Sequence, residues 1–431
     1  MPPKKKEKIP PPGNKKDEYT NFMSKMKWKA AMQKVALEIA GRNIRGPGCL
    51  LVSNAFAKNK HITTIDLSHN HLGDDGAVNL AQALKMNECI QSINIACNDI
   101  TDVGGIALAS AFIPSANPTG QPSQWNRSVY YLNISGNKMR DDTLLAMSNA
   151  IACHRDLSKV DISYNQVGSQ GTKVLMRAMS RNNLCSINFA ANDLRDEGVE
   201  FICEAWKRFG GKGAQTYLNL FRNNLGKSSG ECVGRLMENN DYVSEINLAM
   251  NTLGPKGISS LTRSLLPPFQ NVLKNINLSD NYMEDEGAQC VGDYIASDPP
   301  FLIKLNVNNN RITDRGGARL MRGLRTNTHL QFVMAAYNEF GKETCDQLVE
   351  VVSTAKVLKL IDVKKSHLSD DHCRRIAEAT TGETRVDYGS TEDEYTMRDH
   401  MMRLGDLQLA IEAEEEKAKM KKKKKKPAKA K

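Results

Sequence analysis

The chain has 431 residues, of which 40% are hydrophobic and only 6% aromatic, and its formal net charge is +10. The charge is concentrated at the ends: residues 1–30 sum to +6 and residues 413–431 to +7, which leaves −3 for the body between them. This distribution excludes a uniformly basic body, and no apolar run is long enough to span a membrane.

Two features indicate an intracellular protein in a reducing compartment. Ten cysteines are scattered singly, with no C-x-x-C pair and no Cys/His cluster at the spacing of metal ligands. The N-terminal stretch MPPKKKEKIPPP lacks the apolar segment of a signal peptide. We therefore expect a soluble cytoplasmic protein whose cysteines are small core residues, with no metal ion and no cofactor.

In chain order, residues 1–17 consist mainly of Pro and Lys and predict a disordered tail. Residues 18–33 predict a helix, since apolar residues such as Phe22 and Met26 recur at helical spacing. This helix has two interpretations. It caps the open end of a repeat array, or it is a basic amphipathic helix that docks through Trp28 into a calmodulin-like groove.

Residues 34–383 repeat one pattern, mostly with a period of 28 residues. Each unit reads apolar, two free positions, apolar, one free, apolar, two free, Asn, one free, apolar, as in residues 273–287, LKNINLSDNYMEDEG. Such a period indicates a solenoid of about twelve units, in which Arg42 and Ser366 replace the Asn of the two terminal units. The third apolar positions are Ile39, Leu67, Ile95, Ile134, Ile162, Phe189, Leu220, Leu248, Leu278, Val307, Ala335 and Val363.

The residue types predict a strand, a turn and a helix in every unit. Alternating apolar residues such as Ile276 and Leu278 predict a short strand with one buried face, and stacked strands form a parallel sheet. The following Asn281 predicts side-chain hydrogen bonds to backbone groups that the turn leaves unpaired. An acid seven residues beyond the third apolar position predicts the N-cap of an amphipathic helix. This position holds Asp74, Asp102, Asp141, Asp196, Asp285, Asp314 and Asp370, with Ser169 in the same place.

Insertions interrupt the pattern, which ends near residue 383. The longest insertion, residues 115–125, lies between a helix and the next strand and contains Trp125. It is either a tolerated surface loop or part of a binding face. Residues 384–420 are strong helix formers and predict a charged C-terminal helix, and residues 421–431 predict a disordered Lys-rich tail.

Motifs for catalysis are weak. Residues 225–228, LGKS, resemble the end of a phosphate-binding loop, but Phe221 stands where the first Gly of that motif is required. His69 and His71 flank Asn70 without Cys or carboxylate partners at ligand spacing, so we expect surface histidines. We therefore expect no enzyme activity.

Partner recognition is better supported, through side chains that point away from the core of the sheet. One column, between the second and third apolar positions, is nearly all Asn or Asp from Asp66 to Asp362, and we expect it to be structural. A second column, two residues beyond the third apolar position, varies in size and charge, as a protein-binding surface does. The candidate partner-binding residues are Trp125, Tyr131, Tyr164, Phe221, Arg222, Met250, Tyr337 and Lys365, with Tyr130 and Phe332 also expected to be exposed.

The Lys-rich ends form a second candidate surface. Lysine tails without Arg or aromatic residues predict non-specific attraction to an acidic surface, with tubulin, nucleic acid and anionic lipid as candidates. The alternative is a solubilising or nuclear-targeting role. The residues concerned are Lys4, Lys5, Lys6, Lys421, Lys422, Lys423, Lys424, Lys425 and Lys426.

The pattern L-x-x-L-x-L-x-x-N-x-L at a period of 28 residues resembles the leucine-rich repeat superfamily, and within it the ribonuclease-inhibitor-like class. The resemblance covers about residues 34–380. It implies an α/β solenoid in the form of a curved horseshoe, with parallel strands on the concave side and helices on the convex side. It implies protein–protein recognition and nothing catalytic.

A single solenoid with basic termini is similar to leucine-rich repeat proteins of ciliary and flagellar axonemes, among them the leucine-rich subunit of the nexin-dynein regulatory complex. This similarity implies a cytoskeletal scaffold whose solenoid binds an axonemal protein and whose tails contact microtubules. Two alternatives stay open. One is regulation of a small GTPase, because the Ran GTPase-activating protein resembles this fold, although its C-terminal region is acidic and this one is basic. The other is nucleic-acid binding through the tails.

Overall fold

The computed structural model describes residues 35–114, 124–179, 186–209, 216–380 and 384–388. The chain divides into two compact units, Met1–Asp387 and Tyr388–Lys431, and all described residues except Tyr388 belong to the first. Several predictions lie outside the described residues: both tails with their lysines, the N-terminal capping helix, residues 115–123 of the insertion, and the C-terminal helix beyond residue 388.

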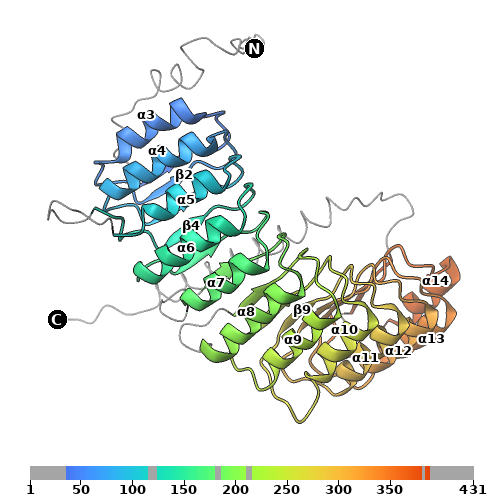
Figure 1. The fold of residues 1–431 in the computed structure, drawn as a ribbon. Coiled ribbons are helices and arrows are strands. Elements are labelled where there is room, and N and C mark those ends of the chain that lie inside the picture. Colours follow the sequence, from blue (N-terminus) through green and yellow to red (C-terminus); the bar gives the residue numbers. More distant parts are fainter. Residues whose placement is uncertain (1–34, 115–123, 180–185, 210–215, 381–383, 389–431) are drawn as a thin grey trace, which may run out of the picture. The chain divides into compact units, whose positions relative to one another are not determined.

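In the described part of the chain, twelve successive strand–helix pairs are followed by a thirteenth strand (Figure 1). Each strand has three residues, because the chain turns out of the sheet before the Asn of each repeat. The strands are β1 (Ala36–Glu38), β2 (Thr64–Asp66), β3 (Ser92–Asn94), β4 (Tyr131–Asn133), β5 (Lys159–Asp161), β6 (Ser186–Asn188), β7 (Tyr217–Asn219), β8 (Glu245–Asn247), β9 (Asn275–Asn277), β10 (Lys304–Asn306), β11 (Phe332–Met334), β12 (Leu360–Asp362) and β13 (Arg385–Asp387). The helices are α3 (Gly46–Phe56), α4 (Gly73–Met86), α5 (Asp102–Ser110), α6 (Asp141–Cys153), α7 (Ser169–Met179), α8 (Arg195–Phe209), α9 (Lys227–Met237), α10 (Gly254–Arg263), α11 (Glu284–Ala296), α12 (Asp314–Leu324), α13 (Lys342–Thr354) and α14 (Asp370–Ala379).

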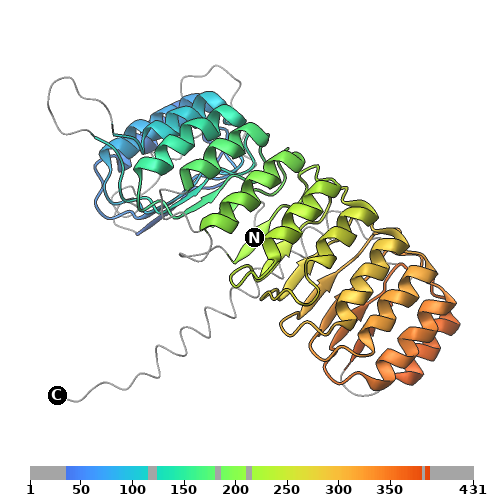
Figure 2. The ribbon, with the colours of Figure 1, turned by 60° about the horizontal axis from the view of Figure 1, so that its bottom comes forward.

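The strands pair in parallel and in chain order, in two sheets, β1–β6 and β7–β13. The register repeats from unit to unit: Ile65 of β2 lies opposite Leu37 of β1 and Ile93 of β3. Consecutive strands can pair in parallel because a helix returns the chain over the same side each time. The helices line one side of each sheet (Figure 2). We call the other side the strand face.

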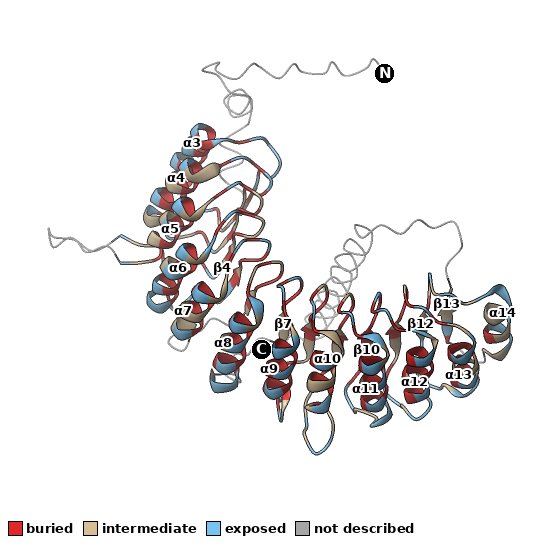
Figure 3. Cartoon of the chain, turned by 45° about the vertical axis from the view of Figure 1, so that its right-hand side comes forward, coloured by how far each residue is buried: buried red, intermediate tan, exposed pale blue. Residues whose placement is uncertain are grey.

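The core lies between the strands and the helices, whose inner faces are buried (Figure 3). All twelve third apolar positions predicted from the sequence are buried, from Ile39 to Val363. Leu80 and Leu84, one helical turn apart on α4, fill the same space and are 0% exposed. The predicted solenoid of about twelve α/β repeats is therefore confirmed.

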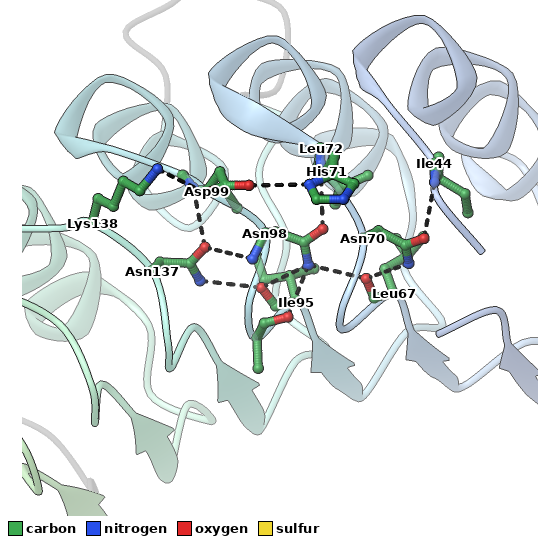
Figure 4. A network of polar contacts seen from close by, with 12 residues as sticks. Ile44, Leu67, Asn70, His71, Leu72, Ile95, Asn98, Asp99, Asn137 and Lys138 are labelled. Carbon is green, nitrogen blue, oxygen red and sulfur yellow. Dashed lines mark hydrogen bonds and ion pairs between the residues drawn. The ribbon is translucent and has the colours of Figure 1, made fainter. Parts of the chain in front are cut away.

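Buried asparagines connect the units, as predicted (Figure 4). Nδ2 of Asn98 donates to the carbonyl of Ile95 in its own coil (3.0 Å) and to that of Leu67 in the preceding coil (3.0 Å). Oδ1 of the next asparagine, Asn137, accepts from the N–H groups of Asn98 (3.0 Å) and Ile100 (3.1 Å). The pattern recurs in other units, so each amide satisfies backbone groups of two coils that no strand ladder reaches.

This asparagine ladder also spans the gap between the two sheets. Among the described strands, β6 and β7 do not pair. Nδ2 of Asn223 nevertheless donates to the carbonyl of Phe189 (3.0 Å), and its Oδ1 accepts from the N–H of Asn192 (3.2 Å). The N–H of Ala191 also donates to the carbonyl of Phe221 (2.6 Å). The two coils are therefore joined through their turns.

The Asn/Asp column on the strand face is structural, as expected. The side-chain oxygen of Asn277 accepts from the N–H of Ser279 (3.1 Å), and the same bond closes the turn after most other strands. Met334 occupies this column in β11 and has no such oxygen. There, Oδ1 of Asn308 in the preceding unit accepts from the N–H of Ala336 (2.8 Å), which replaces the missing bond.

The repeated aspartates do not cap their own helices, so that prediction was wrong. Asp74 lies inside the first turn of α4, which begins at Gly73. Its carboxylate accepts from the N–H of Thr101 (2.8 Å), the hydroxyl of Thr101 (2.7 Å) and the N–H of Gly104 (3.0 Å), at the start of α5. Because neighbouring helices lie side by side in the same direction, the carboxylate reaches the unpaired N–H groups of the next helix.

This capping of one unit by the preceding one recurs along the solenoid. Asp102, Asp141, Asp196, Asp285 and Asp314 each accept from a backbone N–H of the following unit. In the case of Asp74, a glycine in the receiving helix provides the room: a Cβ on Gly104 would lie 2.7 Å from Oδ1 of Asp74. At the end of the array, Asp370 has no following helix among the described residues, and its own helix α14 is capped by Ser369.

The sheet also continues beyond the predicted boundary at residue 383. Val386 of β13 lies opposite Ile361 of β12. The predicted C-terminal helix therefore does not begin at residue 384, and that boundary was wrong. The free edge of β12 offers unpaired backbone groups, and a short strand satisfies them without the apolar spacing or the Asn that marks a repeat in the sequence.

Candidate protein-binding surface on the strand face

The variable column of the repeats lies in the turns that follow the strands, and its backbone is left-handed throughout. The φ angle is between 50° and 65° at all twelve equivalent positions, of which two are glycine. We call these residues the turn row: Gly41, His69, Cys97, Gly136, Tyr164, Ala191, Arg222, Met250, Asp280, Asn309, Tyr337 and Lys365.

Hydrogen bonds between coils impose this conformation. The N–H of Arg222 donates to the carbonyl of Ala249 (2.9 Å), and the adjacent Asn223 is held by the ladder. The equivalent bond joins Tyr164 to Ala190 (2.8 Å). Left-handed backbone costs a residue with a Cβ roughly 1–2 kcal/mol, and it persists where the surroundings over-determine it. The turn row is therefore a rigid platform that presents its side chains from fixed positions.

Three predicted residues, Tyr164, Arg222 and Met250, come together in the middle of this row. Only the small Ala191 separates Tyr164 from Arg222 along it. Tyr164 is 43% exposed, Arg222 is exposed and Met250 is half-buried. Burial raises the pKa of the Tyr164 hydroxyl above its ordinary value, and the nearby charge of Arg222 opposes that effect. We call Tyr164, Arg222 and Met250 the central cluster.

Two further predicted residues are neighbours nearer the C-terminal end of the row. The N–H of Tyr337 donates to the carbonyl of Lys364 (2.9 Å), which places Tyr337 beside Lys365. Tyr337 is half-buried and Lys365 is exposed. Tyr131 lies apart from both groups, half-buried on β4 between Ser92 and Lys159.

Phe221 is buried, so the prediction that it is exposed was wrong. Its side chain is 7% exposed, in a position that other units fill with small buried residues such as Ala190 and Ala249. Its N–H donates to Oδ1 of Asn219 (3.3 Å) and its carbonyl accepts from Asn223 (3.1 Å). The position directly after the third apolar residue lies in the core of most repeats. The aromatic side chain of Phe221 suggested exposure at this position instead.

Trp125 lies at the opposite end of the strands from the turn row, since it precedes β4. Its ring is half-buried and meets the ring of His154 edge-on, with centroids 6.0 Å apart. The guanidinium carbon of Arg127 lies 4.8 Å from its centroid. The adjacent Asn126 donates to the carbonyls of Asn87 (2.7 Å) and Leu84 (3.2 Å). Trp125 therefore anchors the base of the insertion and lies away from the central cluster.

The other sequence candidates have structural roles. His69 and His71 are exposed, as expected, and His71 with Lys138 contacts Asp99 (3.2 and 2.7 Å). Hydrogen bonds from Lys138 and His71 hold the pKa of Asp99 below its ordinary value. Burial raises the pKa of the Cys49 thiol to about 11, which leaves it protonated and unreactive at neutral pH.

The LGKS segment has no vacancy for a phosphate. The N–H of Gly226 donates to Oδ1 of Asp196 (2.7 Å), and the hydroxyl of Ser229 donates to the same oxygen (2.5 Å). A carboxylate therefore already occupies the N-terminus of α9. Within the described ranges, no group of three or more His, Cys, Asp or Glu side chains is arranged to hold a metal ion. In that same part of the chain, every helix is too short or too polar to cross a bilayer.

The sequence indicated that the turn row varies but not that its backbone is left-handed. The available signals were Gly41 and Gly136, because glycine is the residue that adopts positive φ most readily. Asparagine and aspartate at Asn309 and Asp280 are the next most tolerant types. Tyr164, Arg222 and Met250 carry no such signal, and their conformation comes from the coil-to-coil hydrogen bonds.

Comparison with known proteins supports the repeat assignment. A family model described as Leucine Rich repeat matches residues 58–81, 87–109 and 299–321. The chain is 28% identical over 142 residues to human NACHT, LRR and PYD domains-containing protein 13, a match that covers 32% of this chain and 13% of that protein. It is 22% identical over 202 residues to mouse ribonuclease inhibitor, covering 46% of this chain and 43% of the inhibitor.

These matches span less than half of either relative. Among solved structures, an internalin from Listeria monocytogenes aligns with 87% of this chain and 94% of its own, at 14% identity and a TM-score of 0.41. The family match and the relatives agree with the fold described above. The other candidate residues have structural roles, so the strand face and its turn row are the candidate functional surfaces.

Proposed function

Because the chain is built from leucine-rich repeats, we propose that it is a non-enzymatic scaffold that binds a protein partner through the turn row, with the central cluster at the middle of the contact. The observation that supports this proposal is that most positions of the turn row carry a side chain larger than glycine. Glycine would relieve left-handed backbone at every one of these positions, yet ten of the twelve carry a larger residue. Side chains kept at such positions are available for recognition, because they are not needed to form the turn.

The composition of the central cluster supports a protein partner. Tyr and Arg are the residue types that most often dominate protein–protein contacts, and Met adapts its shape to an apolar neighbour. The backbone beneath them is fixed before binding, so little ordering entropy opposes the contact. The Asn and Asp side chains of the strand column are already engaged in turn bonds, which leaves the row as the more accessible source of specificity.

For the biological setting, we propose a cytoskeletal role in the axoneme of a cilium or flagellum, with the Lys-rich ends attracted to the acidic surface of microtubules. The lysine runs at residues 4–6 and 421–426 support this proposal. They are positively charged and contain neither Arg nor aromatic residues. A tail of this kind gives salt-sensitive binding without sequence or shape specificity, while the solenoid selects the partner.

Microtubule co-sedimentation tests the tails. Full-length chain should pellet with microtubules at low salt, and deletion of residues 1–16 and 413–431 together should abolish pelleting. Substitution of Arg222 by Ala, a matched change on the solenoid, should leave pelleting unchanged. Pelleting that survives the double deletion contradicts the tail mechanism, and stimulation of GTP hydrolysis by Ran in a parallel assay would favour the regulatory alternative.

Site-specific photo-crosslinking tests the scaffold role. A photoreactive residue at Met250 should give discrete adducts with one protein in an axonemal extract. The control is the same photoreactive residue at Leu145, which is 51% exposed on α6 and so accessible on the helix side. Equal adducts at both positions, or none at Met250, would refute binding through the turn row.

A further inference from the structure

The helix side of the first four described repeats carries a row of exposed apolar side chains. Helices α3, α4, α5 and α6 pack side by side in chain order (Figure 1). At one equivalent position, eleven residues beyond the third apolar position of each repeat, they hold Leu50, Val78, Ile106 and Leu145. Two further apolar residues flank this row. We call the six residues the outer stripe: Leu50, Leu51, Val78, Val103, Ile106 and Leu145.

The side chains of the outer stripe face solvent. Leu50, Ile106 and Leu145 are 42%, 45% and 51% exposed. Val103 is 65% exposed and Val78 is half-buried. Among the described residues of α7–α14, no large apolar side chain is exposed. Single exposed apolar residues are common on proteins, but a contiguous row across four helices indicates an interaction surface.

The composition of the helix side changes after α6. From α7 to α14 the stripe position is polar or charged, as in Lys173, Glu200 and Arg374, except for the buried Ala318. One turn further along, every helix from α7 to α14 carries a charged residue, whereas α3–α6 carry uncharged ones. The four uncharged residues are Asn54, Gln82, Ser110 and Asn149. Because eight repeats accept a charge there, its absence from α3–α6 is not a requirement of the fold.

This absence of charge restricts what the outer stripe can bind. A charged contact surface would lose water against the stripe and find no counter-charge, which is costly. Along the described helices, the surface that is uncharged at both of these positions is the outer stripe and the turn beside it. The chain itself therefore offers the matching surface, on a second copy.

We propose that the outer stripe pairs with the outer stripe of a second copy of this chain, about a two-fold axis. Packed helices lie about 8–10 Å apart, so their side chains form ridges and grooves at a regular spacing. Rotation by 180° about an axis perpendicular to this surface reverses each helix and keeps the spacing, so the ridges of one copy fit the grooves of the other. This inference concerns the helix side and goes beyond the scaffold function proposed for the turn row.

The outer stripe is large enough for a stable dimer. Four helices that lie about 8–10 Å apart span roughly 35 Å. Along α5 the uncharged surface runs from Val103 to Ser110, about 11 Å at 1.5 Å per residue. With the side chains at its margins, this surface covers on the order of 500 Å². Specific dimers bury about 600–1,000 Å² on each partner, and rim side chains such as Met86, which is 49% exposed, supply the remainder.

Sedimentation equilibrium of the full-length chain tests the pairing. Interfaces of standard size have Kd values of about 1 μM or lower, so the wild type should be mostly dimeric at about 20 μM. Ile106→Glu with Leu145→Glu places four carboxylates in the paired surface and should raise the Kd at least about 100-fold. The matched control, Ser259→Glu with Gln289→Glu, changes the same repeat position on α10 and α11 and should leave the dimer intact.

A charge swap distinguishes loss of pairing from a folding defect. A chain with Ile106→Lys and Leu145→Lys should also be monomeric by itself. Mixed with the Ile106→Glu/Leu145→Glu chain, it should form a dimer of one copy of each, because opposite charges then share one paired surface. Failure of both chains to associate when they are mixed, although each is folded by circular dichroism, would contradict the pairing.

Photo-crosslinking identifies what occupies the outer stripe. A photoreactive residue at Ile106 should give an adduct between two copies of the purified chain. The same adduct at Leu145 has twice the mass of the chain and differs from any adduct with an extract protein, so Leu145 still serves as the control for the turn row.

Three results would overturn the proposal: a wild type that is monomeric at about 100 μM, a dimer that the two glutamates leave unchanged, or crosslinks from Ile106 to a different protein only. None of these results bears on the crosslinks of Met250, so the scaffold proposal is tested separately.

Discussion

The capping of each helix by an aspartate of the preceding unit predicts that Asp74 stabilises its neighbour more than its own helix. In Asp74→Ala, the N–H groups of Thr101 and Gly104 and the Thr101 hydroxyl lose their shared acceptor. Loss of a helix cap typically costs about 1 kcal/mol and up to about 2. We expect a decrease of about 1–2 kcal/mol in the free energy of unfolding, and roughly half of that in Asp74→Asn, which keeps one acceptor oxygen.

Asp75 is the matched control for this prediction. It is adjacent to Asp74 in the first turn of α4 and equally placed to interact with the dipole of that helix, but it is exposed. We expect Asp75→Ala to change the free energy of unfolding by less than about 0.5 kcal/mol. The difference between the two variants then measures the bond between units and removes the contribution of helix propensity.

Urea unfolding followed by circular dichroism gives the global effect, and amide exchange at Thr101 and Gly104 gives the local one. The local measurement is needed because a repeat array can open unit by unit. A loss of about 1.4 kcal/mol corresponds to tenfold faster exchange through local opening. Equal destabilisation by Asp74→Ala and Asp75→Ala, with unchanged exchange at Thr101, would refute capping between units.

Three further predictions follow from the same contacts. Asn281→Ala removes an amide that satisfies backbone of two coils and should lower the free energy of unfolding by about 1–3 kcal/mol in urea titrations. Phe221→Ala should cost about 3 kcal/mol, since the ring is buried; no loss of stability would mean that the ring is exposed as first predicted. Burial tends to raise the pKa of Asp314, but bonds from Thr344, Glu343 and Gly341 hold it below its ordinary 3.8. Its stabilising effect is therefore present above about pH 4 and lost as the pH falls through the lowered pKa, so the stability difference between wild type and Asp314→Ala should shrink in acid, and a constant difference would contradict this.

The repeat period made most of the fold predictable. Apolar columns, the buried Asn and the strand–helix order each follow from one residue type at one spacing, and their roles at Leu67, Asn98 and Leu278 agree with the structure. The capping aspartates were assigned to the wrong helix because sequence spacing places a residue along its own chain. The partner of Asp74 lies 27 residues away, and only the stacking of coils brings it close.

The candidate site was predictable in location and less so in membership. The column that contains Tyr164, Arg222 and Met250 could be identified because its residue type varies from repeat to repeat. The neighbouring columns of the repeat keep the same residue types. Phe221, one position earlier, was misassigned because an aromatic residue in a position for small ones suggests exposure. Trp125 belongs to an insertion, for which the repeat gives no register, so the sequence could not relate it to the central cluster.

Replacement of Tyr164 and Arg222 together by glycine separates recognition from folding at the turn row, because glycine suits left-handed backbone. We expect the free energy of unfolding to stay equal or rise, by up to about 1 kcal/mol per site, while photo-crosslinking from Met250 to the partner is lost. A double variant that is strongly destabilised would show that the side chains of the turn row build the coil. A stable double variant that crosslinks as the wild type does would show that recognition lies elsewhere.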